Sequence, residues 1–382
     1  MKNELNIYRE LQIHLDQFPI GFPPTNSGVE IRLLKYLFTP EEAKIACLLK
    51  FSWNELDSLE NIYERSKFLG YTMEQLENYL DNMAKKGAIN ILKNGDKKTY
   101  GNAMLIVGIF ENQVNKLTKQ FIEDMHQYMR EAWIKDLMKV PIPQWRTIPI
   151  GLDFEHEINI GNYDDIKKLI KIQEGPIAII NCVCRQARDI LEKPCKATSR
   201  REVCMGFGQT AQIYIDLGWA RQISKKEAYE FLHKSQEESL IFQVGNAQIP
   251  EIICSCCTCC CEGLYNLKKL PNPGEFIRTN HFAKIIPNSC TCCGACIDKC
   301  QMVAIYFQEN TYLINQKRCI GCGNCVIACA SDAIKLCKKE KQYVPPMTHN
   351  DLYNEILALK KKRKNRELKR KLRIKKRMLN RS

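Results

Sequence analysis

The cysteines between residues 290 and 329 have the spacing that points most directly to chemistry. They form two runs of the pattern C-x2-C-x2-C-x3-C, and the second run repeats the first after 29 residues. Three cysteines at this spacing can wrap a short loop around one corner of an iron–sulfur cube. The fourth, which we expect to start a helix that points away, reaches the cube of the other run. We therefore expect two [4Fe–4S] clusters rather than zinc sites or free thiols. The expected ligands are Cys290, Cys293, Cys296 and Cys329 for cluster one, and Cys319, Cys322, Cys325 and Cys300 for cluster two.

The segment around these runs resembles the bacterial-type two-cluster ferredoxin domain, over roughly residues 273–340. The repeat continues beyond the cysteines, because Val303-Ala304-Ile305 follows the first run and Asp332-Ala333-Ile334 follows the second, as in that family. The family usually has proline after each fourth cysteine, where this chain has Gln301 and Ala330. The resemblance implies a carrier of single electrons.

Other residues near the runs have expected roles of their own. Gly294, Gly321 and Gly323 stand where the backbone must pass close to inorganic sulfide without a side chain in the way. Cys292 and Cys337 lie outside the repeated pattern, so we expect them to be spare thiols.

Ten further cysteines lie between Gly175 and Gly263, and six of them fall within residues 254–261. Adjacent side chains of a strand point to opposite faces, so a single ion cannot bind all six. We expect a third metal centre here. Thiolates suit iron–sulfur clusters and zinc about equally, and the neighbouring ferredoxin-like unit favours iron–sulfur. The candidate ligands are Cys182, Cys184, Cys195, Cys204, Cys254, Cys256, Cys257, Cys259 and Cys260. We expect Arg185 and Arg188 to be solvated at the surface.

The N-terminal third has helical periodicity. Helices are predicted from Gly28, from the Thr39-Pro40 cap, over about 55–68 and from Thr72 to Gly87, followed by a hairpin of residues 88–92 and 99–102. This order is similar to a winged-helix domain, over about 28–102. The acids Glu74, Glu77 and Asp81 on the would-be recognition helix argue against DNA binding, so we expect a docking or structural role.

The next segment is predicted to be one long amphipathic helix over 110–139, followed by an extended connector that contains Pro141, Pro143 and Pro149. In the cysteine-rich region, strands are predicted over 176–180 and 240–244. Helices are predicted up to about Leu217 and from the capping box at Ser224.

These patterns predict a multidomain α+β protein. The expected parts are an N-terminal arm (1–27), a winged-helix-like domain with long helix and connector (28–150), a cysteine-rich α/β metal-binding domain (151–272), a ferredoxin-like two-cluster domain (273–340) and a basic tail (341–382). The layout resembles multidomain iron–sulfur proteins of anaerobes and archaea.

The net charge of +14 lies almost wholly in the tail, because residues 360–382 contain fourteen Lys or Arg and one acid, Glu367. We expect this tail to leave the fold after Pro345-Pro346 and to be disordered or loosely helical. Nucleic acid, an anionic membrane surface or an acidic redox partner could each attract it, and a solvated extension without a target is an equal alternative.

No apolar run approaches the length of a membrane span, and the first residues lack a secretory pattern. The odd total of 21 cysteines favours metal ligation over disulfides, and we expect a cytoplasmic protein.

We expect an electron carrier, or an electron-input subunit of an oxidoreductase, rather than a stand-alone enzyme. No nucleotide-binding loop and no catalytic residue is predicted. One alternative is an oxidoreductase with an open iron site in the region 182–261. Another is a redox-responsive regulator whose winged helix reads DNA.

Overall fold

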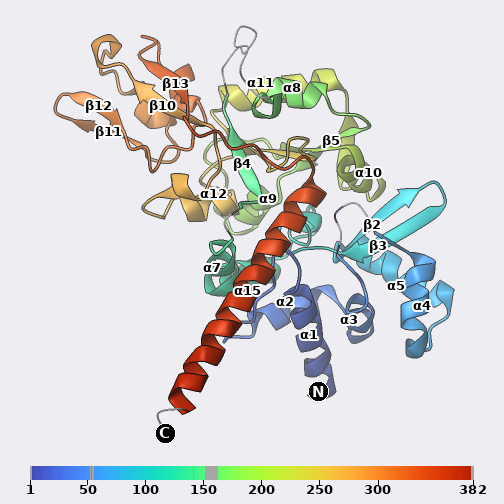
Figure 1. Ribbon diagram of the computed structural model, residues 1–382. Coiled ribbons are helices and arrows are strands. Elements are labelled where there is room, and N and C mark those ends of the chain that lie inside the picture. The colour runs from blue at the N-terminus through green and yellow to red at the C-terminus, as the bar shows by residue number, and fades with distance from the viewer. Residues whose placement is uncertain (1, 52, 54–55, 141, 151–161, 380–382) are drawn as a thin grey trace.

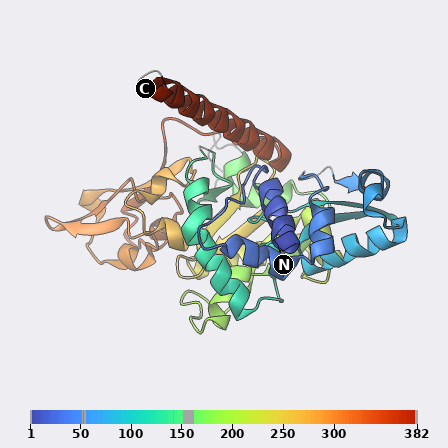
Figure 2. The same ribbon diagram turned by 90° about the horizontal axis from the view of Figure 1, so that it is seen from below.

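A computed structural model describes residues 2–51, 53, 56–140, 142–150 and 162–379. The chain has a helical N-terminal part, a central sheet flanked by helices, and a small cysteine-rich C-terminal unit (Figure 1). A long helix, α15, runs from the middle of the molecule to its own free end. Seen from below, the N-terminal part and the C-terminal unit lie on opposite sides of the central sheet (Figure 2).

The N-terminal part packs its helices around one apolar core, which includes the fully buried Leu11, Leu34 and Leu80. Both predicted caps are present, because Thr39 and Thr72 each form a capping box at a helix start. The helices are α1 (Lys2–Leu15), α2 (Val29–Leu37), α3 (Pro40–Ala46), α4 (Leu59–Ser66) and α5 (Met73–Lys86), and the strands are β1 (Asp57–Ser58), β2 (Ile89–Asn94) and β3 (Lys97–Asn102).

The predicted hairpin forms a small sheet of order β1-β3-β2. Its β3 residue Lys98 lies against α5 and pairs with Glu77 at 2.8 Å and with Asp81 at 2.6 Å. Two of the three acids that argued against DNA binding are therefore already paired within the domain.

The prediction of one long helix over 110–139 is wrong. The chain forms a 3-10 turn at Glu111–Gln113 and passes through Asn115, whose φ of 63° is incompatible with a right-handed helix. The helix begins only after Thr118, whose side chain accepts a hydrogen bond from the Phe121 amide. The helical elements are α6 (Lys119–Tyr128), a π-helical turn η3 (Met129–Trp133) and α7 (Ile134–Leu137).

The central sheet has six strands in the order β4-β8-β9-β6-β5-β7, with antiparallel neighbours throughout. The strands are β4 (Trp145–Ile148), β5 (Ile177–Asn181), β6 (Glu202–Phe207), β7 (Ala220–Ile223), β8 (Ile241–Gly245) and β9 (Ile252–Cys256). The predicted strands and the Ser224 capping box are confirmed. The predicted connector differs, because its residues 145–148 form the edge strand β4.

The two faces of this sheet have different side chains. One face is apolar, with Val203, Met205 and Phe207 of β6 packed in a core with Leu169 and Phe231. That core is covered by α8 (Ile166–Lys171) and α11 (Lys225–Glu237), and the other helices of this part are α9 (Val183–Ile190), α10 (Gly208–Asp216) and α12 (Glu262–Leu267). Because strand residues alternate, Cys204 lies on the other face, toward the N-terminal part.

The C-terminal unit contains two short antiparallel sheets and two single-turn helices. Its elements are β10 (His281–Ile285), α13 (Ala295–Lys299), β11 (Ile305–Gln308), β12 (Thr311–Ile314), α14 (Asn324–Ile327) and β13 (Ile334–Lys338). Strand β10 pairs with β13 and β11 pairs with β12.

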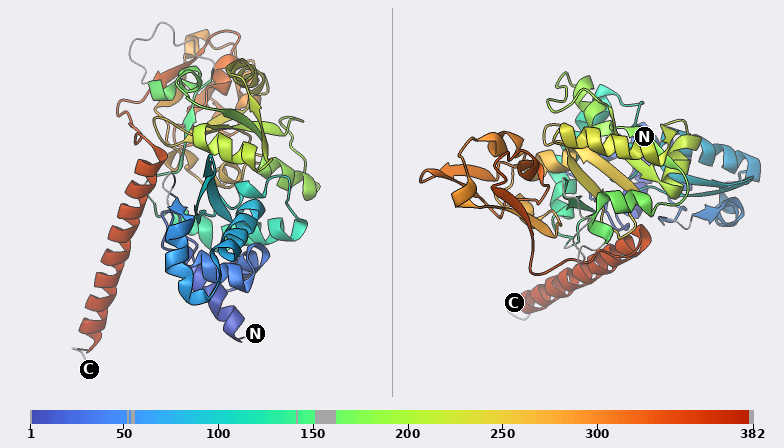
Figure 3. Two further views of the ribbon diagram at one scale, coloured as in Figure 1. Left: turned by 90° about the vertical axis from the view of Figure 1, so that its right-hand side faces the viewer. Right: turned by 90° about the horizontal axis from the view of Figure 1, so that it is seen from above.

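The expectation that the tail leaves the fold is wrong for its first half. Residues His349–Leu379 form the helix α15, and Leu352 and Ile356 on it are fully buried in the N-terminal core. The ammonium of Lys360 donates hydrogen bonds to the carbonyl oxygens of Asp16 and Phe18, at 2.7 and 2.8 Å. Arg363 and Lys364 then pair with Asp136 and Asp16, and beyond these contacts the helix projects away from the body (Figure 3).

None of the helices among the described residues combines the length and the apolar composition that a bilayer crossing requires.

Replacing a core residue of α15 should destabilise the N-terminal part. For Ile356→Ala we expect a loss of about 2–5 kcal/mol of unfolding free energy, because a buried isoleucine leaves a cavity. Denaturant unfolding of the full chain measures this loss. The exposed Lys361→Ala should stay within about 0.5 kcal/mol. Equal small effects of both variants would show that α15 does not pack on the core.

Candidate metal centres

The two cysteine runs of the C-terminal unit have the same backbone conformation. Positive φ angles recur at positions 29 residues apart. The pairs are Cys292 and Gly321 (54° and 63°), Gly294 and Gly323 (80° and 85°), and Val303 and Asp332 (53° and 53°). The repeat in sequence is therefore also a repeat in structure, and Cys292 occupies the place that glycine has in the second run.

Two of the glycines are required by contacts with a neighbouring segment. A Cβ atom at Gly321 would lie 2.3 Å from the carbonyl oxygen of His281, and one at Gly323 would lie 2.5 Å from that of Ile150. Cys292 is exposed, so the first run has room for a side chain there. This constraint adds to the close approach to sulfide that the sequence suggested.

We expected the fourth cysteine of each run to start a helix, and this expectation is wrong. The helices α13 and α14 begin after Gly294 and Gly323 and contain the third cysteine of each run, and Cys300 is the C-cap of α13. The turn after the fourth cysteine supplies an amide instead. The Ala304 amide donates to the sulfur of Cys300, and the Ala333 amide donates to that of Cys329, both at 3.2 Å.

The electrostatic neighbours of the third cysteines show which thiols lie together. Burial raises the pKa of Cys296, and nearby Cys290, Cys293 and Cys329 raise it further. Burial likewise raises the pKa of Cys325, with Cys322, Cys319 and Cys300 as its first cysteine neighbours. These are the two sets of four that the crossed assignment names. A small cavity is also lined by all four members of the second set. Neither set is compact enough for one ion. Among the described residues, three or more ligand atoms lie within 4.8 Å of one another in one group only, and that group belongs to the central part. The spacing and the amide donors fit [4Fe–4S] clusters.

That compact group consists of four cysteines of the central part. The sulfur of Cys195 lies 3.6 Å from that of Cys257 and 3.8 Å from that of Cys259, and Cys259 lies 3.3 Å from Cys257 and 3.7 Å from Cys260. Four sulfurs about 2.3 Å from one tetrahedral ion stand about 3.8 Å apart, since the edge of a tetrahedron is 1.63 times its radius. The group therefore has the dimensions of a single-ion site. A four-iron cube places its thiolates farther apart.

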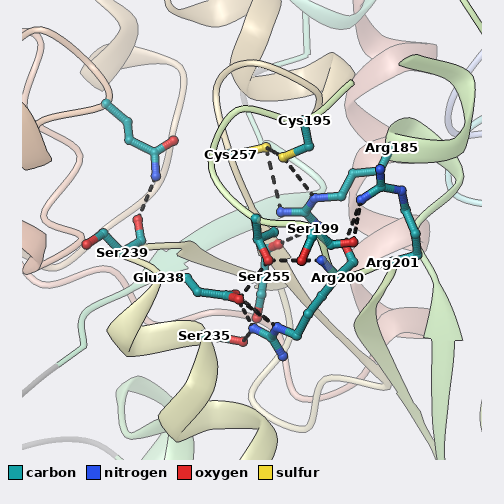
Figure 4. A network of polar contacts seen from close by, with 12 residues as sticks. Arg185, Cys195, Ser199, Arg200, Arg201, Ser235, Glu238, Ser239, Ser255 and Cys257 are labelled. Carbon is teal, nitrogen blue, oxygen red and sulfur yellow. Dashed lines mark hydrogen bonds and ion pairs between the residues drawn. The ribbon is translucent and has the colours of Figure 1, made fainter. Parts of the chain in front are cut away.

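Arg185 supplies a positive charge to this group. Its Nε donates to the sulfur of Cys195 at 3.4 Å, a terminal nitrogen contacts Cys257 at 3.6 Å, and the other donates to the Ser255 carbonyl oxygen at 3.1 Å. Figure 4 shows the guanidinium directed at both sulfurs. The expectation of surface solvation is wrong for Arg185, which is 1% exposed, and for Arg188, which is buried against Glu262. Arg185 stands three residues after Cys182 on the same helix, and this spacing is the signal in the sequence that could have predicted its contact with the thiols.

The remaining six cysteines of the central part form a ring. Each thiol interacts with two others, so the circuit closes on itself. Hydrogen bonds from Cys184 and Cys204 lower the pKa of Cys182, and hydrogen bonds from Cys184 and Cys256 lower that of Cys261. Cys254 links Cys204 to Cys256. In order around the ring, the members are Cys182, Cys184, Cys261, Cys256, Cys254 and Cys204.

The ten cysteines are thus sorted into a group of four and a ring of six. The run 254–261 contributes three to each. Cys254 and Cys256 lie on one face of β9, and the other four follow β9, where the chain turns. Cys261 was not among the predicted ligands, although it stands in the same run. We call the first group the compact site and the second the thiol ring.

The thiol ring lines a cavity of about 380 Å³. The opposite wall is apolar and comes from the N-terminal part, with Phe110, Trp133 and Leu137 among its residues. One carboxyl group, that of Glu111, lies in this wall. Burial raises the pKa of Glu111 to about 7. The Gly108 amide, which donates a hydrogen bond to this carboxylate at 2.9 Å, lowers the pKa, but by less than burial raises it.

The C-terminal unit touches the compact site directly. Gln301 follows Cys300, and Thr258 lies between Cys257 and Cys259. The Thr258 amide donates to the Gln301 side-chain oxygen at 2.9 Å, and the Thr258 hydroxyl donates to the Gln301 carbonyl oxygen at 3.3 Å. The Gln301 side-chain amide donates to the Ser239 carbonyl oxygen at 2.6 Å. Glutamine at the usual proline position therefore holds the two parts together.

Comparison with known proteins finds one similarity. Residues 312–335 match the family model described as a 4Fe-4S binding domain. No curated protein and no solved structure matches the chain. The matched segment contains Cys319, Cys322, Cys325 and Cys329, so the second cysteine run belongs to a 4Fe–4S binding segment of ferredoxin type. Together with the compact site, this match indicates an iron–sulfur protein.

Proposed function

We propose that the chain is an electron-transfer protein in which the C-terminal unit connects a redox partner to the metal centre of the central part. Cys290, Cys293, Cys296 and Cys329 would hold one [4Fe–4S] cluster, and Cys319, Cys322, Cys325 and Cys300 the other. Such clusters, when bound, accept and release single electrons. The contact between Gln301 and Thr258 carries the proposal, because it joins the second cluster set to the compact site through a single pair of residues.

The two cluster sets differ in exposure, and this difference would give electron transfer through the C-terminal unit a direction. Cys293 of the first set is exposed, whereas the second set adjoins the central part, where the Ile150 amide donates to the Cys322 carbonyl oxygen at 3.0 Å. Apolar side chains of the C-terminal unit are also exposed, among them Phe307 at 53% and Val303 at 59%. An exposed apolar patch of this kind suits a protein partner.

The compact site would hold one tetrahedral metal ion. Iron there would extend the electron path into the central part, and zinc would make the site structural. The buried guanidinium of Arg185 offsets part of the negative charge of four thiolates around a divalent ion.

The N-terminal part would serve as a docking or structural domain. Its helices followed by a sheet of order β1-β3-β2 support the likeness to a winged helix. The pairing of Glu77 and Asp81 with Lys98 removes part of the charge objection to DNA binding, so a redox-responsive regulator remains the alternative for this domain.

A second candidate function is an oxidoreductase with its site in the central part. The cavity beside the thiol ring favours it, because a volume of about 380 Å³ with apolar walls can take a small molecule. Glu111, with a pKa of about 7, is placed to hold a proton at that cavity.

Adjacent cysteines provide a matched test of the cluster assignment. For Cys293→Ala we expect the loss of up to about four irons and four sulfides per chain, because a [4Fe–4S] cluster loses a ligand. For Cys292→Ala we expect no loss. Iron and acid-labile sulfide are counted on anaerobically purified protein. Equal counts in both variants would contradict the assignment.

Removing a ligand of the compact site should release one metal ion and no sulfide. Cys259→Ser leaves three thiolates, so affinity for a tetrahedral ion falls. Metal analysis of the full chain for iron and zinc measures the loss and identifies the ion. The exposed Cys292→Ser is the control. Loss of sulfide together with metal in Cys259→Ser would show that the site is a cluster.

The domain contact is tested at Gln301. Gln301→Leu removes the acceptor of the Thr258 amide, and loss of a hydrogen bond of about 1.4 kcal/mol should speed exchange of that amide about tenfold. We also expect slower electron transfer between the C-terminal unit and the central part, followed by freeze-quench electron paramagnetic resonance. Gln308→Leu, whose side chain bonds only locally to Glu309, is the control. Unchanged electron transfer in Gln301→Leu would remove the contact from the path.

A further inference from the structure

The fold brings the six members of the thiol ring together from segments far apart in the sequence. Cys204 on β6 and Cys254 on β9 are direct partners across an antiparallel pair, and Cys256 lies two residues on, along the same face. Cys182 and Cys184 stand where β5 leads into α9, and Cys261 is the N-cap of α12. Two strands and two helix starts therefore direct six thiols at one cavity.

The thiol ring is too wide for a single ion. Among the described residues, the compact site is the group of three or more ligand atoms that all lie within 4.8 Å of one another. No three sulfurs of the ring satisfy this limit, although each interacts with its two neighbours. Three or four ligands on one ion about 2.3 Å away would have to stand about 3.8 Å apart. A larger metal assembly is needed to contact all six.

The surroundings of the thiol ring supply little positive charge. The described basic residues of the cavity wall are Arg185 and Arg278. The guanidinium of Arg185 bonds to sulfurs of the compact site, and its charge also acts on Cys182 of the ring. Six buried thiolates against an apolar wall would be strongly destabilised without cations. Six neutral thiols, in contrast, would give no reason for their convergence from four chain segments.

We propose that the thiol ring binds a polynuclear iron–sulfur cluster, separate from the compact site and from the two clusters of the C-terminal unit. The cavity provides room for several irons and sulfides, and thiolates are the ligands such assemblies take. The cluster faces the apolar wall of the N-terminal part, so part of its surface is open to the cavity. This proposal does not depend on the electron path through Gln301.

The test counts acid-labile sulfide in the full chain after anaerobic reconstitution with ferrous iron and sulfide. Two [4Fe–4S] clusters account for about eight sulfides, and the compact site for none. We expect about four or more sulfides beyond these in the unaltered chain. Cys256→Ser should lose that excess and keep about eight. The control Cys337→Ser, outside every set, should keep the full count.

Three results would overturn the proposal. The first is a total of about eight sulfides in the unaltered chain, a count that needs no variant and so holds even if Cys256→Ser fails to fold. The second is disulfide bonds among the ring cysteines in peptides mapped from anaerobic protein. The third is loss of sulfide in Cys293→Ala but not in Cys256→Ser, which would keep the C-terminal clusters and reject only the ring cluster.

Discussion

The cost of burying sulfur anions is the constraint on which this structure depends. Eighteen of the 21 cysteines stand in four sets, and the groups of the central part lie against apolar walls or within an apolar core. A thiolate in such surroundings needs a cation or several hydrogen-bond donors. The chain provides a few fixed donors, such as Arg185 at the compact site and the Ala304 and Ala333 amides in the C-terminal unit. Metal ions would supply the remaining positive charge.

The alternation of side chains along a strand decides how the densest cysteine run is used. Cys254 and Cys256 point to the cavity face of β9, and the chain then turns at Thr258, so that Cys257 and Cys259 meet Cys195 instead. Thr258 in that turn is also the residue held by Gln301. The same few residues therefore separate the compact site from the thiol ring and attach the C-terminal unit to the central part.

Local signals in the sequence predicted local structure well. The threonine caps, the hairpin and the repeat of 29 residues each depend on neighbouring residues, and each is present. Features that depend on distant contacts could not be predicted in this way. The basic tail looked solvated because its charge is high, but Leu352 and Ile356 lie in the core of the N-terminal part. The helix over 110–139 looked continuous because its apolar spacing continues through Asn115, where the backbone turns.

The same difference applies to the metal centres. Spacing alone was enough to propose ligands in the C-terminal unit, since its cysteines are close in sequence. The sorting of the other ten into four and six depends on the order of β5, β6 and β9 in the sheet, which no motif records. Native mass spectrometry of the anaerobically purified chain tests the central claim most directly, because it weighs everything that the thiols hold. We expect the polypeptide mass plus three iron–sulfur assemblies and one further ion. The mass of the bare or disulfide-linked polypeptide would contradict it.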